Sequence, residues 1–159
     1  MEDQQPPVKE VAGLKHYWVD EQFEVGASRS DVFARLSDLR SWPSWAPGIA
    51  GFVRRGDAPL REGDHFLFMP KLAFIPFPLV MPCKVYRMDE RCIEWGLGLL
   101  GSEVRHRFEL TPTGPERTRV RHVEYASNLM AIVAAPAAPI ALRFNRSLSK
   151  GVQRQFPAA

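Results

Sequence analysis

The feature of this sequence that most restricts its fold is a change in hydrophobic period near residue 126. Before that point, apolar and polar residues alternate in several short runs, which is the pattern of half-buried strands. After it, apolar residues recur every fourth residue, as on one face of an amphipathic helix: Ile140, Phe144, Leu148 and Val152. Strands separated from a terminal helix in this way favour an α+β fold with a largely antiparallel sheet.

Turn residues divide the alternating region into separate strands. Strand patterns cover residues 16–25, 49–55, 64–69, 84–88, 93–99, 104–110 and 117–125. Ser28 or Ser30 can cap a short helix over residues 31–36, and a second short helix is predicted over residues 38–45. We therefore predict a curved antiparallel sheet of about six or seven strands, with two short helices after the first strand and a long C-terminal helix packed over the sheet.

The length of 159 residues fits one domain, and no repeat or linker divides it. Residues 1–14, rich in Gln and Pro, are expected to form a flexible lead-in, and residues 15–156 a single domain. The segment 70–82 is expected to be an edge, a bulge or a loop, because proline cannot donate to a sheet ladder. One helix cannot cover a strongly curved sheet completely, so a cavity between sheet and helix is expected.

The composition indicates which cellular compartment and which cofactors to expect. Cys83 and Cys92 are too few for a disulfide framework, so we expect two small buried hydrophobes in the reducing cytoplasm. The apolar stretch 129–142 is shorter than the ~20 residues of a membrane span and contains two prolines, so it is expected to be a buried helix. No phosphate-binding loop, zinc-finger pattern or catalytic-triad spacing occurs, and neither cofactor nor metal is expected.

The net charge of +3 is unevenly distributed along the chain. No acidic residue follows Glu124, whereas four basic residues do: Arg143, Arg146, Lys150 and Arg154. Such a face can meet acidic lipid or nucleic acid. Aromatic residues do not interleave with these charges, which favours a solvated helix face and no nucleic-acid partner. A membrane surface stays open as an alternative.

Four local patterns occur in an order typical of one superfamily: FEVGASRSDVF at residues 23–33, SDLRSWPSWAPG at 37–48, LREGD at 60–64 and TRVRHVEY at 118–125. This order resembles that of the START-like superfamily (SRPBCC, helix-grip), which includes the polyketide cyclase/dehydrase proteins. The resemblance covers about residues 15 to 155. It implies a ligand-binding fold, but not one reaction, because this fold hosts both carriers and enzymes.

A G-x-G-x-x-G pattern at residues 96–101 is interpreted as a hairpin. The dinucleotide fingerprint needs a strand that feeds a helix, whereas these glycines precede an alternating run at residues 104–110.

Polar residues on the last two strands form the candidate catalytic site. Side chains alternate along a strand, so His106 lies on the same face as Phe108, and His122 on the same face as Glu124. A turn centred on Gly114 would place His106 opposite His122. Histidines beside a carboxylate suit general acid–base chemistry. The alternative interpretation is a hydrogen-bonded group that only orients a ligand or fills the interior.

A second set of residues is large and apolar, and it is predicted to line the ligand cavity: Trp45, Phe66, Phe68, Trp95, Phe108, Val120 and Phe144. Ordinary core packing is the alternative for each. The leading functional prediction is binding of a hydrophobic or aromatic small molecule, lipid or polyketide-like. Two alternatives remain, a polyketide cyclase/dehydrase-type enzyme and an adaptor that binds a membrane or partner through the basic helix. The sequence predicts no particular oligomeric state.

Overall fold

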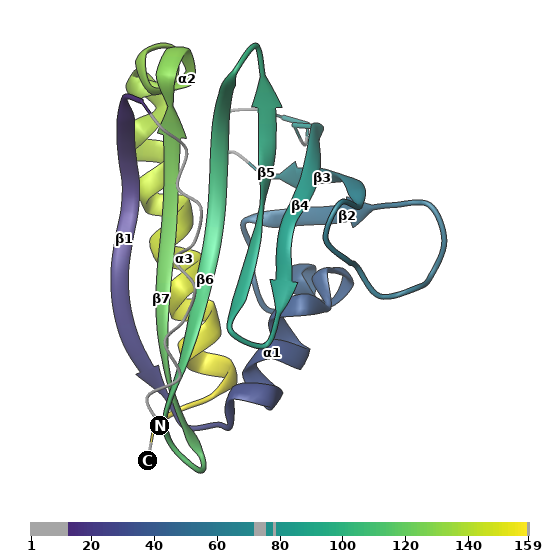
Figure 1. Cartoon of the computed structure of the whole chain (residues 1–159), viewed down its shortest axis with the longest axis vertical. Coiled ribbons are helices and arrows are strands. Elements are labelled where there is room, and N and C mark those ends of the chain that lie inside the picture. Colours follow the sequence, from purple (N-terminus) through teal and green to yellow (C-terminus); the bar gives the residue numbers. More distant parts are fainter. Residues whose placement is uncertain (1–12, 72–75, 78, 159) are drawn as a thin grey trace.

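The computed structural model describes residues 13–71, 76–77 and 79–158. Seven strands form one antiparallel sheet in the order β1-β7-β6-β5-β4-β3-β2 (Figure 1). Their bounds are β1 Lys15–Val25, β2 Ile49–Val53, β3 His65–Pro70, β4 Met81–Asp89, β5 Cys92–Leu99, β6 Ser102–Gly114 and β7 Arg117–Ser127. The first strand therefore pairs with the last, and the others pair with their neighbours in sequence.

Helices follow the first and the last strand of the sheet. After β1 come α1 (Arg29–Ser37) and the 3₁₀ helix η1 (Leu39–Ser44), and after β7 come α2 (Asn128–Val133), the 3₁₀ helix η2 (Ala135–Ala137) and α3 (Ala138–Gln155). Ser28 caps α1, because its hydroxyl oxygen accepts a hydrogen bond from the Asp31 N–H at 3.2 Å. The order of elements is the predicted helix-grip arrangement.

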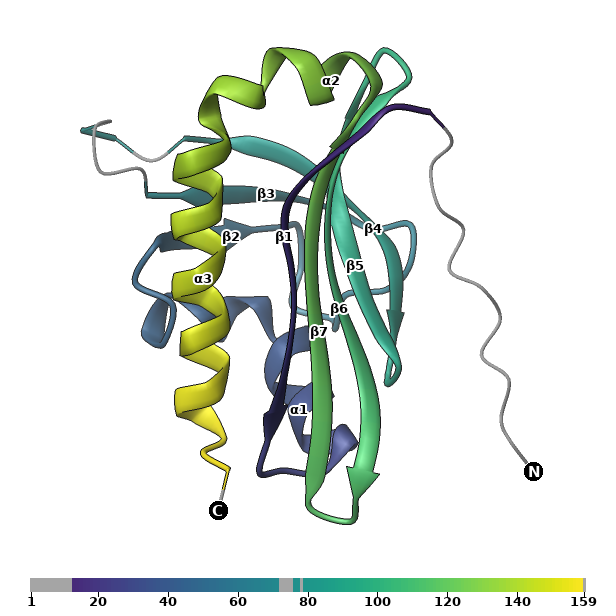
Figure 2. The same cartoon turned by 90° about the vertical axis from the view of Figure 1, so that its left-hand side faces the viewer.

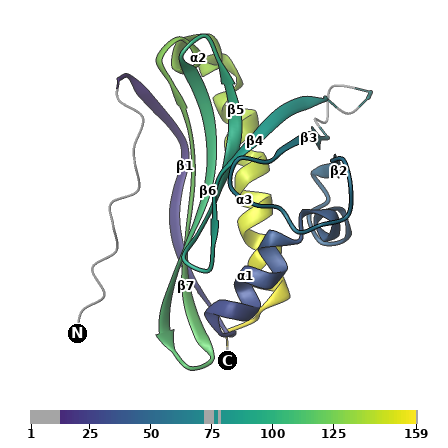
Figure 3. The ribbon, with the colours of Figure 1, turned by 45° about the vertical axis from the view of Figure 1, so that its right-hand side comes forward.

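The sheet curves strongly around α3. Figure 2 shows β2 and β3 turned across the direction of β1 and β7, and Figure 3 shows α3 on the concave side. Register irregularities interrupt four of the strand pairings, and such bulges increase the local twist and bend of a sheet. Leu148 and Val152 of α3 share one core cluster with Val25 and Val120 of the sheet, so the main core lies between helix and sheet.

The proline-rich segment and the predicted lead-in are described only in part. Pro70 ends β3 and pairs with Ile49, and Pro82 lies at the start of β4 opposite Leu67. Residues 72–75 and 78 of the segment 70–82 lie outside the described residues, as do residues 1–12 of the lead-in.

The prediction of a buried helix over residues 129–142 is wrong. The helix breaks at η2, where Pro136 lies, and α3 begins only at Ala138. Leu129, Ile132 and Val133 are 51%, 62% and 57% exposed. They are exposed because α2 lies at the end of the sheet, beyond the last residue of β7, where no other element covers it in the part of the chain that the structure describes (Figure 1).

The glycine-rich pattern forms a hairpin, as predicted, since β5 and β6 pair directly from Cys92–Glu109 to Leu99–Ser102. Gly96 is required by the close approach of the two strands. A Cβ atom added at Gly96 would lie 1.9 Å from the carbonyl oxygen of Val104, on the neighbouring backbone. At Gly98, two residues along the same strand, the nearest atom would be the Tyr86 hydroxyl at 3.4 Å.

Replacement of Gly96 should therefore destabilise the sheet far more than replacement of Gly98. We expect Gly96→Ala to lower the free energy of unfolding by about 1–3 kcal/mol, because backbone must move to admit the methyl group. Gly98→Ala is the matched control and should change it by less than about 0.5 kcal/mol. Urea denaturation followed by circular dichroism measures both, and equal stabilities would contradict this packing of β5 on β6.

Candidate functional site

The strands β6 and β7 place the predicted catalytic residues on one inner face, in a register that differs from the prediction. His106 lies opposite Glu124, Phe108 opposite His122 and Leu110 opposite Val120. The predicted pairing of His106 with His122 is wrong by two residues, because the turn falls after Gly114, which pairs with Arg117 across a register shift. A shift of two residues preserves the face, so the three residues still lie together.

The two histidines are deeply buried, with 2% of His106 and none of His122 exposed. Their ring centroids are 4.7 Å apart. Trp95 stacks on His106 with centroids 4.6 Å apart, and Phe108 stacks on His122 at 4.5 Å. The imidazoles therefore lie inside an aromatic environment, remote from bulk water.

Helix α3 adds two polar residues that the sequence analysis missed, Asn145 and Ser149. The Ser149 hydroxyl is 2.6 Å from Nδ1 of His122. The Asn145 amide donates hydrogen bonds to the Glu124 carboxylate and, at 2.8 Å, to the carbonyl oxygen of Ala141. Both residues are buried, and their spacing of four places them on one face of the helix. That spacing, beside the apolar positions 148 and 152, was the signal available in the sequence.

We call these five residues the polar cluster: His106, His122, Glu124, Asn145 and Ser149. Several of its buried atoms have no hydrogen-bond partner within the described part of the chain: both ring nitrogens of His106, Nε2 of His122, and Oδ1 of Asn145. The indole N–H of Trp95, stacked on His106, is also unpaired there. A buried polar group without a partner costs about 1–3 kcal/mol, so these atoms favour a polar occupant.

Burial shifts the proton affinities of the polar cluster. Desolvation lowers the pKa of His122 to about 3, and desolvation together with the nearby His122 holds the pKa of His106 well below its usual value. Desolvation raises the pKa of Glu124 to about 7, against a smaller lowering by the Asn145 hydrogen bond. Near neutral pH both imidazoles are therefore uncharged, while the Glu124 carboxyl group is partly protonated and partly ionised.

The residues predicted to line a ligand cavity contact one another. Six of the seven are buried, Phe144 is partly buried, and all belong to the main core or pack against it. Phe68 lies 5.0 Å from Trp95 between ring centroids, and Phe66 lies 5.6 Å from Trp95. Trp42 of η1 lies among them, with ring contacts to Trp45, Phe52, Trp95, His106 and Phe108.

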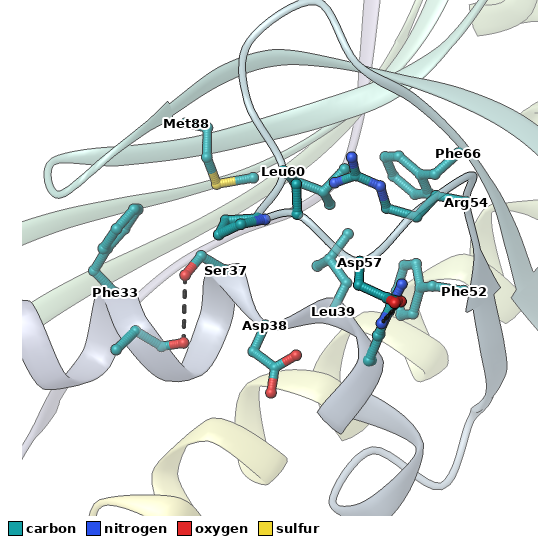
Figure 4. Close-up of a pocket in the computed structure, with 14 residues that line it drawn as sticks. Phe33, Ser37, Asp38, Leu39, Phe52, Arg54, Asp57, Leu60, Phe66 and Met88 are labelled. Atoms are coloured by element: carbon teal, nitrogen blue, oxygen red, sulfur yellow. Dashed lines mark hydrogen bonds and ion pairs between the residues drawn. The ribbon is translucent and has the colours of Figure 1, made fainter.

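A pocket of about 540 Å³ lies beside this aromatic core, between α1, η1 and the segment that follows β2 (Figure 4). Apolar side chains form much of its lining: Phe33, Leu39, Phe52, Leu60, Phe66 and Met88. Arg40, paired with Asp57 at 2.7 Å, and Arg54 are its cationic residues. Phe66 belongs both to this lining and to the predicted ligand-binding set. No residue of α3 lines this pocket, so it does not lie between the sheet and α3, where the sequence predicted a cavity.

Within the ranges described above, no group of three or more His, Cys, Asp or Glu side chains is arranged to hold a metal ion. Among the same residues, no helix is long and apolar enough to cross a membrane. Cys83 and Cys92 are free and buried, and desolvation raises the pKa of each thiol to about 12.

Residues 18–156 match the protein family described as polyketide cyclase/dehydrase and lipid transport. The chain belongs to this family. No curated protein sequence gives a significant match. The match covers both strands of the polar cluster and all of α3, and the family is one whose members typically bind hydrophobic ligands in a cavity.

Solved structures share the fold at low sequence identity. A START superfamily protein from Mycobacterium smegmatis is 20% identical, with a TM-score of 0.67 over 87% of this chain and 95% of that one. Major latex-like protein 151 from Panax ginseng is 15% identical, with a TM-score of 0.67 over 92% of this chain and 100% of that one. An aromatase/cyclase from a Streptomyces species is 13% identical, with a TM-score of 0.58 over 92% and 99%.

The raised pKa of Glu124 should make stability depend on pH. Between the usual glutamate pKa of 4.5 and about 7, the folded chain binds a proton that the unfolded chain has released, so stability falls as pH rises through this window. Glu124→Gln cannot lose a proton and so removes this pH dependence. The free energy of unfolding of the variant minus that of wild type should therefore be about 2–3 kcal/mol larger at pH 8 than at pH 4. Urea denaturation across this pH range measures the difference. Parallel pH profiles for the two proteins would contradict a desolvated Glu124.

Proposed function

We propose that the chain binds a hydrophobic or aromatic small molecule that carries one uncharged polar group, in the interior between the sheet and α3. The observation that carries this proposal is the polar cluster, whose unpaired atoms lie among stacked aromatic rings. A ligand that supplies a hydroxyl or carbonyl oxygen there would satisfy atoms that otherwise remain without partners. Membership of a family that typically binds hydrophobic ligands supports the same function.

The pocket beside α1 supports a route to the interior. Phe52 and Phe66 line this pocket, and both contact Trp95, with ring centroids 6.1 and 5.6 Å away. Trp95 in turn stacks on His106. In this proposal, rotation of the two phenylalanine rings joins the pocket to the polar cluster, and a ligand of the pocket's size replaces ring–ring contacts with its own apolar surface.

The charge state of the polar cluster determines which polar group of a ligand it favours. Neutral imidazoles can each donate one hydrogen bond and accept one, and Ser149 occupies Nδ1 of His122, which leaves Nε2 for a ligand. No cation belongs to the polar cluster, whereas Glu124 brings partial negative charge near neutral pH. The site therefore favours a phenol, alcohol or ketone over a carboxylate or a phosphate.

Paired probes test this selectivity. β-Naphthol and naphthalene share one aromatic body, so a hydrogen bond to the polar cluster should make wild-type protein bind the naphthol about tenfold more tightly, as one net hydrogen bond allows. His122→Leu should remove most of that preference while keeping affinity for naphthalene. His65→Leu, at an exposed position on β3, is the matched control. Quenching of tryptophan fluorescence measures all affinities, and absent binding or an unchanged preference in His122→Leu contradicts the proposal.

A second candidate function is acid–base catalysis on a bound ketone, favoured by the pKa of Glu124 near 7. A carboxyl group with this pKa can take a proton from carbon beside a carbonyl and return it, while a neutral imidazole donates a hydrogen bond to the carbonyl oxygen. His106 lies directly opposite Glu124 on β6, which places a base and a hydrogen-bond donor on adjacent strands.

Deuterium exchange separates catalysis from binding. If Glu124 is a base, wild-type protein should accelerate exchange of the acidic C–H hydrogens of β-tetralone, measured by NMR. Glu124→Gln should reduce this acceleration about 100-fold or more while leaving affinity within a few-fold. Exchange at the buffer rate in wild-type protein, or undiminished exchange in Glu124→Gln, would contradict the catalytic candidate. Neither result would contradict the binding proposal.

A further inference from the structure

One end of the molecule carries large apolar side chains that point into solvent. They come from three elements that meet there, the start of β1, the β5–β6 turn and α2 (Figure 1). We call this set the apolar end: Leu14, Leu99, Leu100, Leu129, Ile132 and Val133, all more than half exposed. Monomeric proteins rarely gather so many exposed apolar residues in one place unless the patch binds something.

Hydrogen bonds join the three elements of the apolar end. The Asn128 N–H donates to the carbonyl oxygen of Leu14 at 2.7 Å, and the Asn128 side-chain amide donates to the carbonyl oxygen of Gly101 at 3.0 Å. The Leu129 N–H donates to the Ser102 hydroxyl at 3.1 Å. The apolar side chains are therefore held on one built surface rather than scattered along loose segments.

Leu100 is placed at the tip against its own backbone preference. It is 85% exposed and has a φ of 51°, and the following Gly101 has a φ of 72°. Two positive φ values in a two-residue hairpin favour Asn-Gly or Gly-Gly, and a branched apolar residue there is strained. Leu100 gains little burial within its own chain to offset this backbone strain. Insertion of its side chain into an apolar phase outside the protein would offset the strain.

Cations lie along the outer face of α3, which begins after α2 and η2 and runs away from the apolar end (Figure 2). Arg143, Arg146 and Lys150 are exposed and line one groove of about 410 Å³, together with Pro139, the second residue of α3. No acidic residue follows Glu124 in the sequence, so α2 and α3 carry only positive charge. The nearby Glu103 is already paired with Arg105 at 2.7 Å.

We propose that this end of the molecule docks on the surface of an anionic lipid bilayer. The apolar tips of the β5–β6 turn and α2 enter the acyl boundary, and Arg143 and Arg146 bind headgroup phosphates. The patch protrudes at a hairpin tip, which suits a deformable lipid phase. A second copy of the chain fits less well, since the net charge of +3 and the basic helix would bring like charges together.

Co-sedimentation with vesicles tests the proposal. Wild-type protein should pellet with vesicles of phosphatidylcholine and phosphatidylglycerol in roughly a three-to-one ratio, far less with phosphatidylcholine alone, and less as salt is raised. Arg143→Glu should weaken binding to the anionic vesicles about tenfold or more. Arg117→Glu, at the β6–β7 turn at the other end of the sheet, is the charge-matched control and should bind like wild type.

Leu100→Asn is the decisive variant, because asparagine suits the positive φ and should leave the hairpin as stable as before or more so. It should lower vesicle affinity about tenfold while the melting temperature stays equal or rises. Val53→Asn, at an exposed apolar position on β2, is the control and should bind vesicles like wild type. Naphthol affinity should be unchanged in Leu100→Asn, which keeps this test independent of the interior site.

Three outcomes would overturn the proposal. Wild-type protein could remain in the supernatant with anionic vesicles, or Leu100→Asn could pellet as wild type does. The third is a dimer in analytical ultracentrifugation that Leu100→Asn dissociates, which would assign the apolar end to a second copy of the chain.

Discussion

The register of β7 is the constraint on which the interior depends. This strand is hydrogen-bonded on both sides, to β1 and to β6, and it directs Val120, His122 and Glu124 toward α3. A slip of one residue would instead bury Arg119 and Arg121, whose charges pair with acidic residues of the neighbouring strands on the outer face. Which residues of β7 face inward is therefore determined by the cost of burying these charges in a slipped register.

Both faces of the sheet carry buried polar groups. On the outer face, Glu94 is buried but ion-paired to Arg105 and Arg107, each at 3.1 Å. On the inner face, the polar cluster keeps unpaired nitrogens among aromatic rings although α3 could have carried apolar side chains at positions 145 and 149. Nε of Arg107 and the Tyr125 hydroxyl, also on the outer face, likewise lack a partner among the described residues. What distinguishes the inner face is that its unpaired atoms gather in one cluster among stacked aromatic rings, which supports the proposed ligand site.

Alternation predicted which side of each strand His106, His122 and Glu124 would occupy, because a period of two is independent of pairing partner. It could not predict the register, since a bulge before Gly114 moves every opposing pair. Nor could it show that Trp45, Phe68 and Trp95 fill the space under α3 while a pocket opens beside α1, because side-chain packing depends on long-range contacts. The burial predicted for the apolar stretch after β7 is wrong, because hydrophobicity predicts burial only where another element covers the residue.

Helix α3 serves the interior and the surface with different residues. Asn145 and Ser149 face the sheet, whereas Arg143, Arg146 and Lys150 line its outer groove. With 3.6 residues per turn, these two sets occupy separate stripes, so either can change without moving the other. The helix can therefore keep one packing on the sheet while the proposed ligand contacts its inner polar residues and the proposed lipid surface contacts its outer charges. This separation fits a fold shared with solved structures that are only 13–20% identical in sequence.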